Sequence, residues 1–141
     1  MATINATINI TSDIAYSGFS LSKTMTMTKA DNATGIENTN GLGVKKLAAT
    51  TAVVLELATD ATASGANKLY IRNTGSNKAE HVKISFNASA SADTTTEAIG
   101  RLYGGDWMLI PWEANGTTHN VIAAPSTADE VTTIEYMTFH E

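Results

Sequence analysis

Proton transfer at neutral pH usually depends on a histidine or on paired carboxylates in one cleft, so the three histidines are the first candidates for chemistry. His81 lies in a run whose alternation places it on an outward strand face. His119 lies beside the turn dipeptide Asn115-Gly116, and His140 is the penultimate residue. Because they fall in three separate segments, we expect three solvated surface histidines and a protein that is not an enzyme.

Metal chemistry would need clustered histidine or carboxylate ligands, and the sequence has neither a His-Glu-x-x-His motif nor an Asp-rich calcium loop. The densest acidic group is Asp129, Glu130 and Glu135, and Asp31 stands alone in a polar stretch. A solvated turn is the simpler interpretation, and a surface calcium ion is the alternative. The absence of cysteine excludes disulfides, thiolate zinc sites and thiol catalysis. We therefore expect no metal and no cofactor.

Two glycine groups, Gly41-Leu42-Gly43 and Gly104-Gly105, resemble phosphate-binding loops only in composition. A phosphate cradle uses the amides at a helix N-terminus, and neither group precedes a helical pattern. Both groups therefore predict turns.

Three aromatic residues, Tyr103, Trp107 and Trp112, surround one predicted turn and strand. Exposed together, they would stack on sugar rings or anchor a protein interface. In the alternative, they belong to the core or to intersubunit packing, with Trp107 and Leu109 pointing inward and Trp112 capping one end. The sequence leaves both interpretations open.

Composition limits the class of partner. The 141 residues are 43% hydrophobic and only 16% charged, and the formal net charge is −5. Few basic residues on an acidic chain argue against binding to nucleic acid or to an anionic membrane surface. No apolar window approaches the roughly 20 residues of a membrane-spanning helix, and residues 1–14 lack the features of a signal peptide. We expect a soluble protein.

The first segment alternates with a period of two. Ile4, Ile8 and Ile10 fall on one face, and Thr and Asn fall on the other, which predicts a half-buried strand. Residues 19–28 alternate in the same way. The segment 1–14 is either an ordinary first strand of its own sandwich or an arm that adds to a neighbouring molecule.

Further short apolar or alternating runs predict strands along the rest of the chain, at 44–47, 53–57, 69–72, 82–86, 99–102, 107–112, 121–124 and 131–139. We expect a loop over 29–43 and a hairpin between 69–72 and 82–86. Pro111 limits its run to a strand end or to an edge strand. No amphipathic helix and no domain boundary is evident. Residues 1–141 therefore predict one all-β domain, a single antiparallel β-sandwich of jelly-roll type.

The order of segments over about residues 68–139 resembles small accessory virion proteins of tailed bacteriophages. The segments are LYIRNTG at 69–75, VKISF at 82–86, RLYGGD at 101–106 followed by Pro111, VIAA at 121–124 and TIEY at 133–136. The resemblance implies a jelly roll or sandwich used in capsid decoration, tail or fibre components. The first half of the chain matches such proteins only in style.

Together these observations lead to the hypothesis of a decoration or cement protein that binds the major capsid protein and reinforces the capsid of a virion. It would act without catalysis, as a homo-oligomer, and the form that we expect is a trimer. The alternative is a carbohydrate- or receptor-binding module of a tail fibre or spike. The candidate interface residues are Ile4, Ile8, Ile10, Tyr103, Trp107 and Trp112.

Overall fold

The computed structural model describes residues 4–12, 19–27, 36, 38–47, 51–56, 58–61, 65–88, 98–115, 118–126 and 132–140. The strands are β1 (Asn5–Ser12), β2 (Phe19–Thr26), β3 (Asn38–Thr39), β4 (Gly43–Leu47), β5 (Val53–Glu56), β6 (Lys68–Asn73), β7 (His81–Asn87), β8 (Ala98–Tyr103), β9 (Trp107–Pro111), β10 (Asn120–Pro125) and β11 (Thr132–His140), and a short 3-10 helix, η2, spans Ala58–Asp60. All pairings between these strands are antiparallel. In this described part of the chain, no helix is both long and apolar enough to cross a membrane.

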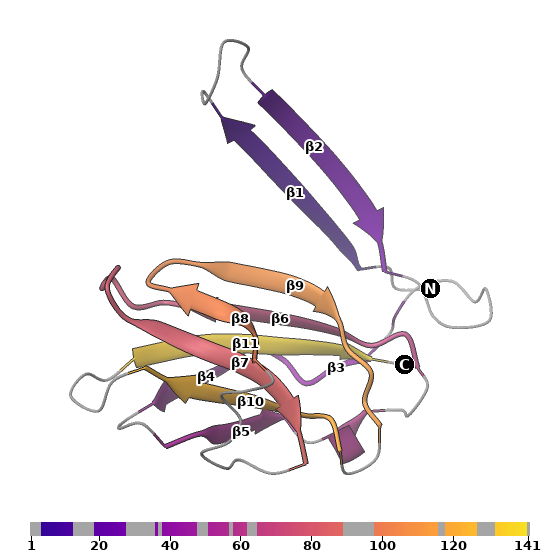
Figure 1. The fold of residues 1–141 in the computed structure, drawn as a ribbon. Coiled ribbons are helices and arrows are strands. Elements are labelled where there is room, and N and C mark those ends of the chain that lie inside the picture. The colour runs from indigo at the N-terminus through magenta and orange to yellow at the C-terminus, as the bar shows by residue number, and fades with distance from the viewer. Residues whose placement is uncertain are drawn as a thin grey trace.

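Strands β4 to β11 form two sheets packed against each other (Figure 1). One sheet has the order β4-β11-β6-β9, with β3 on the same edge of β11 as β4. The other has the order β5-β10-β7-β8. From β4 onward, each connection changes sheet except the one from β7 to β8. Eight strands in this order form a jelly roll, so the predicted all-β sandwich of jelly-roll type is confirmed.

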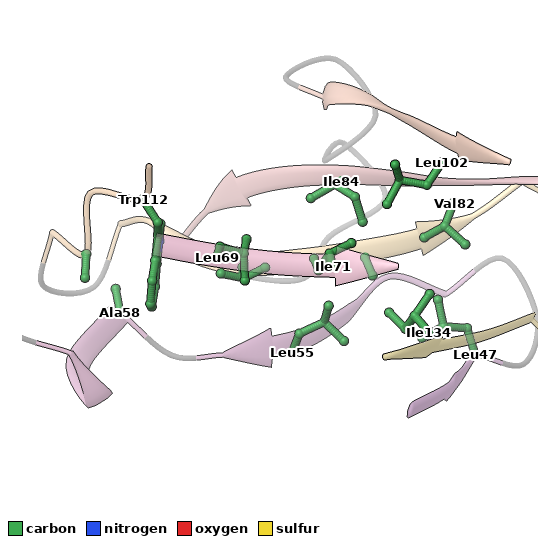
Figure 2. Packing of buried hydrophobic residues seen from close by; sticks show 13 residues of the cluster. Leu47, Leu55, Ala58, Leu69, Ile71, Val82, Ile84, Leu102, Trp112 and Ile134 are labelled. Carbon is green, nitrogen blue, oxygen red and sulfur yellow. The ribbon is translucent and has the colours of Figure 1, made fainter. Parts of the chain in front are cut away.

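The core lies between the two sheets, and strand alternation explains which side chains reach it. β6 lies between β9 and β11. Its residues Leu69 and Ile71 are fully buried, whereas its Arg72 is exposed. Burying each such aliphatic side chain stabilises the fold by about 1.5–3 kcal/mol. Figure 2 shows the cluster that results, in which side chains from both sheets meet: Leu47, Leu55, Ala58, Leu69, Ile71, Val82, Ile84, Leu102, Trp112, Ala114, Val121, Ala123 and Ile134.

The predicted hairpin between residues 69–72 and 82–86 is wrong. β6 pairs with β9 and β11, whereas β7 pairs with β8 and β10, so the connection between β6 and β7 crosses from one sheet to the other. The turn at 103–106 also crosses, from β8 to β9. A short glycine-containing loop permits either arrangement, and the long-range pairing with β9 and β11 decides between them.

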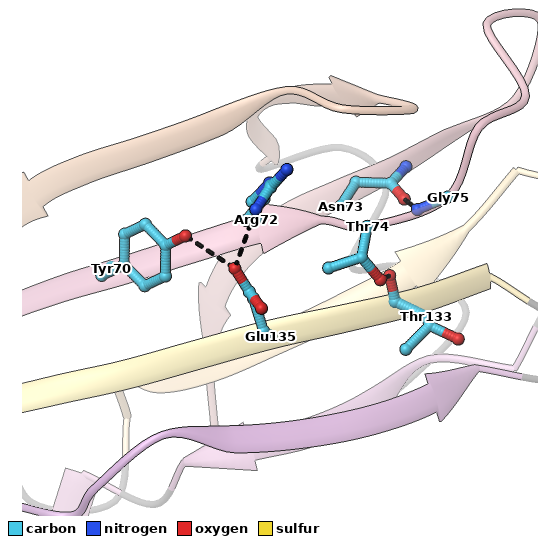
Figure 3. Close-up of polar contacts among 7 residues, drawn as sticks. All are labelled: Tyr70, Arg72, Asn73, Thr74, Gly75, Thr133 and Glu135. Carbon is cyan, nitrogen blue, oxygen red and sulfur yellow. Dashed lines mark hydrogen bonds and ion pairs between the residues drawn. The ribbon is translucent and has the colours of Figure 1, made fainter.

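Asn73, at the end of β6, joins these two crossings. Its backbone N–H donates to the Asp106 carbonyl, and its carbonyl accepts from the Gly105 N–H, both at 2.9 Å. Its side-chain Nδ2 donates to the Leu102 carbonyl at 3.0 Å, and its Oδ1 accepts from the Gly75 N–H at 2.9 Å (Figure 3). Asn73 is buried, so its own polar groups depend on these partners for their hydrogen bonds.

The two glycines of the second crossing are required by its geometry. The Gly104 N–H donates to the Asn77 carbonyl at 3.2 Å, and a Cβ on Gly104 would lie only 2.5 Å from that oxygen. Gly105 has a φ of 90°, a conformation that residues with a side chain rarely adopt. The turn predicted at this glycine pair is therefore confirmed, with a close approach between two loops as its cause.

Two smaller expectations have different outcomes. Pro111 ends β9, which pairs only with β6 among the described strands, so the predicted edge position is confirmed. The loop expected over 29–43 contains a two-residue strand, because Asn38 and Thr39 pair with the end of β11. The other predicted strands are present, with bounds that differ by a few residues.

We predict that Asn73→Ala lowers the free energy of unfolding by about 2–4 kcal/mol, because it leaves the Leu102 carbonyl and the Gly75 N–H without their partner. Thr74→Ala is the matched control. It removes a 2.9 Å bond from an exposed hydroxyl to the Thr133 carbonyl and should change the free energy by less than about 1 kcal/mol. Urea unfolding of both variants measures the difference. Equal effects would contradict the role given to Asn73.

Candidate functional site

Strands β1 and β2 form a two-stranded sheet of their own, which we call the arm (residues 4–12 and 19–27). Figure 1 shows the arm projecting away from the sandwich. β1 belongs to neither sheet of the jelly roll. A two-stranded hairpin is marginally stable in water unless more strands or a packing surface support it. The arm therefore depends on contacts beyond its own two strands.

One face of the arm is polar and internally hydrogen-bonded. Cross-strand side-chain bonds join Thr7 Oγ1 and Thr24 Oγ1 at 2.8 Å, Ser22 Oγ and Asn9 Oδ1 at 2.5 Å, and Thr26 Oγ1 and Asn5 Oδ1 at 2.8 Å. Such Thr and Asn pairs stabilise neighbouring strands and remain compatible with water. This face needs no partner.

The opposite face is apolar and mostly uncovered. It carries Ala6, Ile8 and Ile10 from β1, paired across the strands with Met25, Lys23 and Leu21. The exposed fractions are 36% for Ile8, 47% for Ile10 and 45% for Met25. The apolar faces of these two strands, which the sequence predicted to be half-buried, are thus not covered by other described residues of the same molecule.

The base of the arm is fixed to the rest of the chain by a small buried link. The Met27 N–H donates to the Ile4 carbonyl at 2.9 Å, and the Met27 carbonyl accepts from the Ile36 N–H at 3.1 Å. Met27 and Ile36 are almost completely buried, and Ile4 is half-buried. Three of the predicted interface residues lie in this region. Ile4 belongs to the buried link at the base of the arm, and Ile8 and Ile10 lie on its exposed apolar face.

A groove of about 260 Å³ separates the apolar face of the arm from the sandwich. Ala6, Ile8 and Met25 line it on the arm side, and Leu109 and Pro111 of β9 line it on the other side. Its walls are almost entirely apolar. An open apolar groove of this kind is typical of a surface that binds another molecule.

Two lysines, Lys23 on the arm and Lys68 on β6, also line the groove. The Lys68 ammonium donates to the Ala66 carbonyl at 2.7 Å, so its charge is held by the backbone. Lys23 is exposed. Among the described lining residues no carboxylate is present, so the groove is apolar and its charged groups are the two lysines.

The predicted aromatic group does not assemble. Trp112 is 2% exposed and packs in the core, where its Nε1 donates to the His119 carbonyl at 2.9 Å. Trp107 is 50% exposed and points outward, and Tyr103 lies in the other sheet beside His81. The expectation that Trp107 points inward is therefore wrong, because residues 108 and 110 of β9 face the core instead.

Trp107 instead belongs to a second polar and aromatic cluster on the outer face of the larger sheet. Glu135 Oε1 accepts from the Tyr70 hydroxyl at 2.8 Å and lies 3.4 Å from Arg72 Nη1 (Figure 3). Trp107 is paired with Arg72 across the strands, and an open hollow lies between Tyr70, Arg72, Gly105 and Trp107. The sequence missed this cluster because its members come from three strands that only the sheet order brings together.

The three histidines lie in different elements, and none is fully exposed. His119 Nδ1 lies 3.1 Å from the Thr118 hydroxyl, and His140 Nε2 lies 2.9 Å from Asn40 Oδ1. His81 packs against the Tyr103 ring with centroids 5.2 Å apart, and its Nε2 is buried without a hydrogen-bond partner. The expectation of a solvated side chain is therefore wrong for His81.

One nearly buried carboxylate, Glu56, lies at the edge of the smaller sheet. Asn40 Nδ2 donates to its Oε1, and Asn40 in turn lies beside His140. Burial and the charge of Asp60 raise the pKa of Glu56, while the Asn40 hydrogen bond and His140 act in the opposite direction. The hydrogen bonds between Glu56 and Asn40 and between Asn40 and His140 link β5 to the end of β11. They hold one carboxylate oxygen of Glu56 in a structural bond, which is poor geometry for proton transfer to a substrate.

The structure brings no metal ligands together in the part of the chain that it describes. Glu135 contacts Tyr70 and Arg72. Asp31, Asp129 and Glu130, the other carboxylates of the calcium alternative, lie outside the described residues.

Comparison with protein-family models gave no match, and comparisons with curated proteins and with solved structures gave no significant match either.

The buried position of His81 predicts a pH-dependent stability. Burial, followed by the positive charges of Arg101 and Lys83, lowers the pKa of His81 below its ordinary value of 6.5. The unfolded chain then binds the proton more tightly, so the His81 contribution to stability is present above pH 6.5 and is lost as pH falls below that value.

His81→Phe should reduce this loss, because phenylalanine keeps an aromatic ring beside Tyr103 and cannot take up a proton. Urea unfolding of the parent chain and the variant on both sides of pH 6.5 measures the effect. An identical pH dependence in the two proteins would show that His81 does not contribute.

Proposed function

We propose that this chain is a structural protein of a bacteriophage virion, a decoration or cement protein that binds the major capsid protein and reinforces the capsid without catalysis. The observation that carries the proposal is the arm. It leaves the jelly roll, satisfies one face by its own hydrogen bonds and presents the apolar residues Ile8, Ile10 and Met25 on the other. A projecting pair of strands of this kind is one way in which an assembly protein contacts a neighbouring molecule.

The fold and the surface chemistry support the same proposal. The jelly roll is used by viral capsid domains and by lectins, so it is compatible with assembly but does not by itself assign it. The chain carries few charges for its size, with 9 basic and 14 acidic residues. Uncharged polar surfaces can approach each other closely without strong repulsion, which suits repeated contacts on a lattice.

A second candidate function is favoured by the cluster around Trp107. A half-exposed indole next to an arginine and a carboxylate offers a stacking surface and hydrogen-bonding groups for a sugar ring. Both contacts of Glu135 in the structure use Oε1. A carbohydrate- or receptor-binding module of a tail fibre or spike would use this cluster, in place of the predicted group of Tyr103, Trp107 and Trp112.

The direct test of the first proposal is quantitative mass spectrometry of purified particles from the phage that encodes the chain. We expect a copy number comparable with that of the major capsid protein, because a cement protein covers the lattice. A few copies per particle would favour a tail or fibre location. Absence from the particles would contradict a virion role.

The second candidate is tested by titrating the chain with soluble host cell-wall polysaccharide and following tryptophan fluorescence. Sugar stacking on Trp107 would change the emission of the parent chain and leave that of Trp107→Phe unchanged. Trp112→Phe is the control, since it removes the buried indole and keeps the exposed one. No change in the parent chain would remove this candidate.

A further inference from the structure

We propose that the groove between the arm and β9 is filled by apolar side chains from the arm of a second copy of this chain, so that copies join through exchanged arms. The inference rests on the proposed function, in which the chain is an assembly subunit, and it names the partner of the arm. The groove is bounded by Ile8 and Met25 on one side and by Leu109 and Pro111 on the other.

The shape of the arm is the first reason. On the arm side, Ala6, Ile8 and residues 23–25 line the groove, and Figure 1 shows β1 and β2 diverging from β9 toward the far end of the arm. Ile10, nearer the tip, is 47% exposed and is not part of the groove lining. The chain therefore leaves Ile10, on the outer part of the described arm face, uncovered.

Chemical complementarity is the second reason. Every copy presents an arm face that is apolar except for Lys23 and a groove wall that is almost entirely apolar, which are the two surfaces that a shared contact needs. The arm, residues 4–12 and 19–27, contains one charged residue, Lys23, so its formal net charge is +1. A positively charged arm is attracted to a second chain of net charge −5.

The available area is the third reason. Eight residues per strand and two strands give one arm face of roughly 26 Å by 10 Å, from the rise and spacing of β-strands. Two reciprocal arm contacts then bury about 1,000 Å² when both surfaces of each are counted, which reaches the lower limit for a specific interface. A single arm contact falls well below that limit, so mutual exchange is favoured over one-sided docking.

The exchange also gives the two-stranded arm a packing surface, which stabilises it. The groove wall of the second copy, packed against the apolar face of each exchanged arm, gives each marginal hairpin the packing surface that it lacks. The polar face, with its three cross-strand side-chain bonds, remains in contact with water. Identical elements that cover each other between copies are a common route to oligomers.

The first test is the molar mass of the full chain by sedimentation equilibrium. We expect a multiple of 14.8 kDa for the parent chain. Ile10→Lys should weaken association by at least about tenfold, because it adds a second positive charge to a face that already carries Lys23. Asn9→Lys is the matched control on the adjacent polar face and should associate like the parent chain. A parent chain that is monomeric at every concentration, or an Ile10→Lys variant that associates normally, would overturn the inference.

The second test uses the absence of cysteine, which makes introduced thiols unique. Ile10→Cys protein is mixed with Leu109→Cys protein and treated with a short bismaleimide. We expect covalent dimers that contain one copy of each variant, with far fewer when Asn9→Cys replaces Ile10→Cys. Equal yields from the two arm positions would contradict arm exchange. A monomeric chain that is still abundant on virus particles would leave the proposed function standing and remove only the exchange.

Discussion

The jelly roll depends on the corner at which two connections cross between its sheets. Asn73 binds both crossings through its backbone and its side chain, and Gly104 and Gly105 allow the loops to approach each other. This corner sets where β9 begins and therefore which of its side chains face outward. The outward direction of Trp107, and the contribution of β9 to the groove wall, both follow from it.

The arm obeys a different constraint. The sandwich closes around a core of aliphatic side chains from both sheets, whereas the arm has only two strands and no core of its own. Its polar face is saturated by Thr, Ser and Asn hydrogen bonds, so the remaining drive to bind lies on the face of Ile8, Ile10 and Met25. The sandwich thus has a buried core, whereas the arm has an apolar face that no core covers. This exposed face is the physical basis of the assembly role proposed above.

Local patterns in the sequence were sufficient for the strands but not for their partners. The alternation of Ile4, Ile8 and Ile10 has a period of two whatever the strand pairs with, so strand positions were predictable. The loop after Asn73 is equally compatible with a hairpin and with a sheet crossing, and contacts to distant residues decide between them. For the same reason the cluster of Trp107, Arg72 and Glu135 could not be found from spacing, since those residues are neighbours only across strands.

The central claim is that the apolar face of the arm is covered by another molecule of the same chain. Amide hydrogen exchange measured over a range of protein concentrations tests it most directly, because protection in β1 and β2 then depends on association. The account predicts that amides around Ile8, Ile10 and Met25 become more protected as concentration rises, while those around Leu69, Ile84 and Val121 in the core stay constant. Arm protection that does not change with concentration would contradict it.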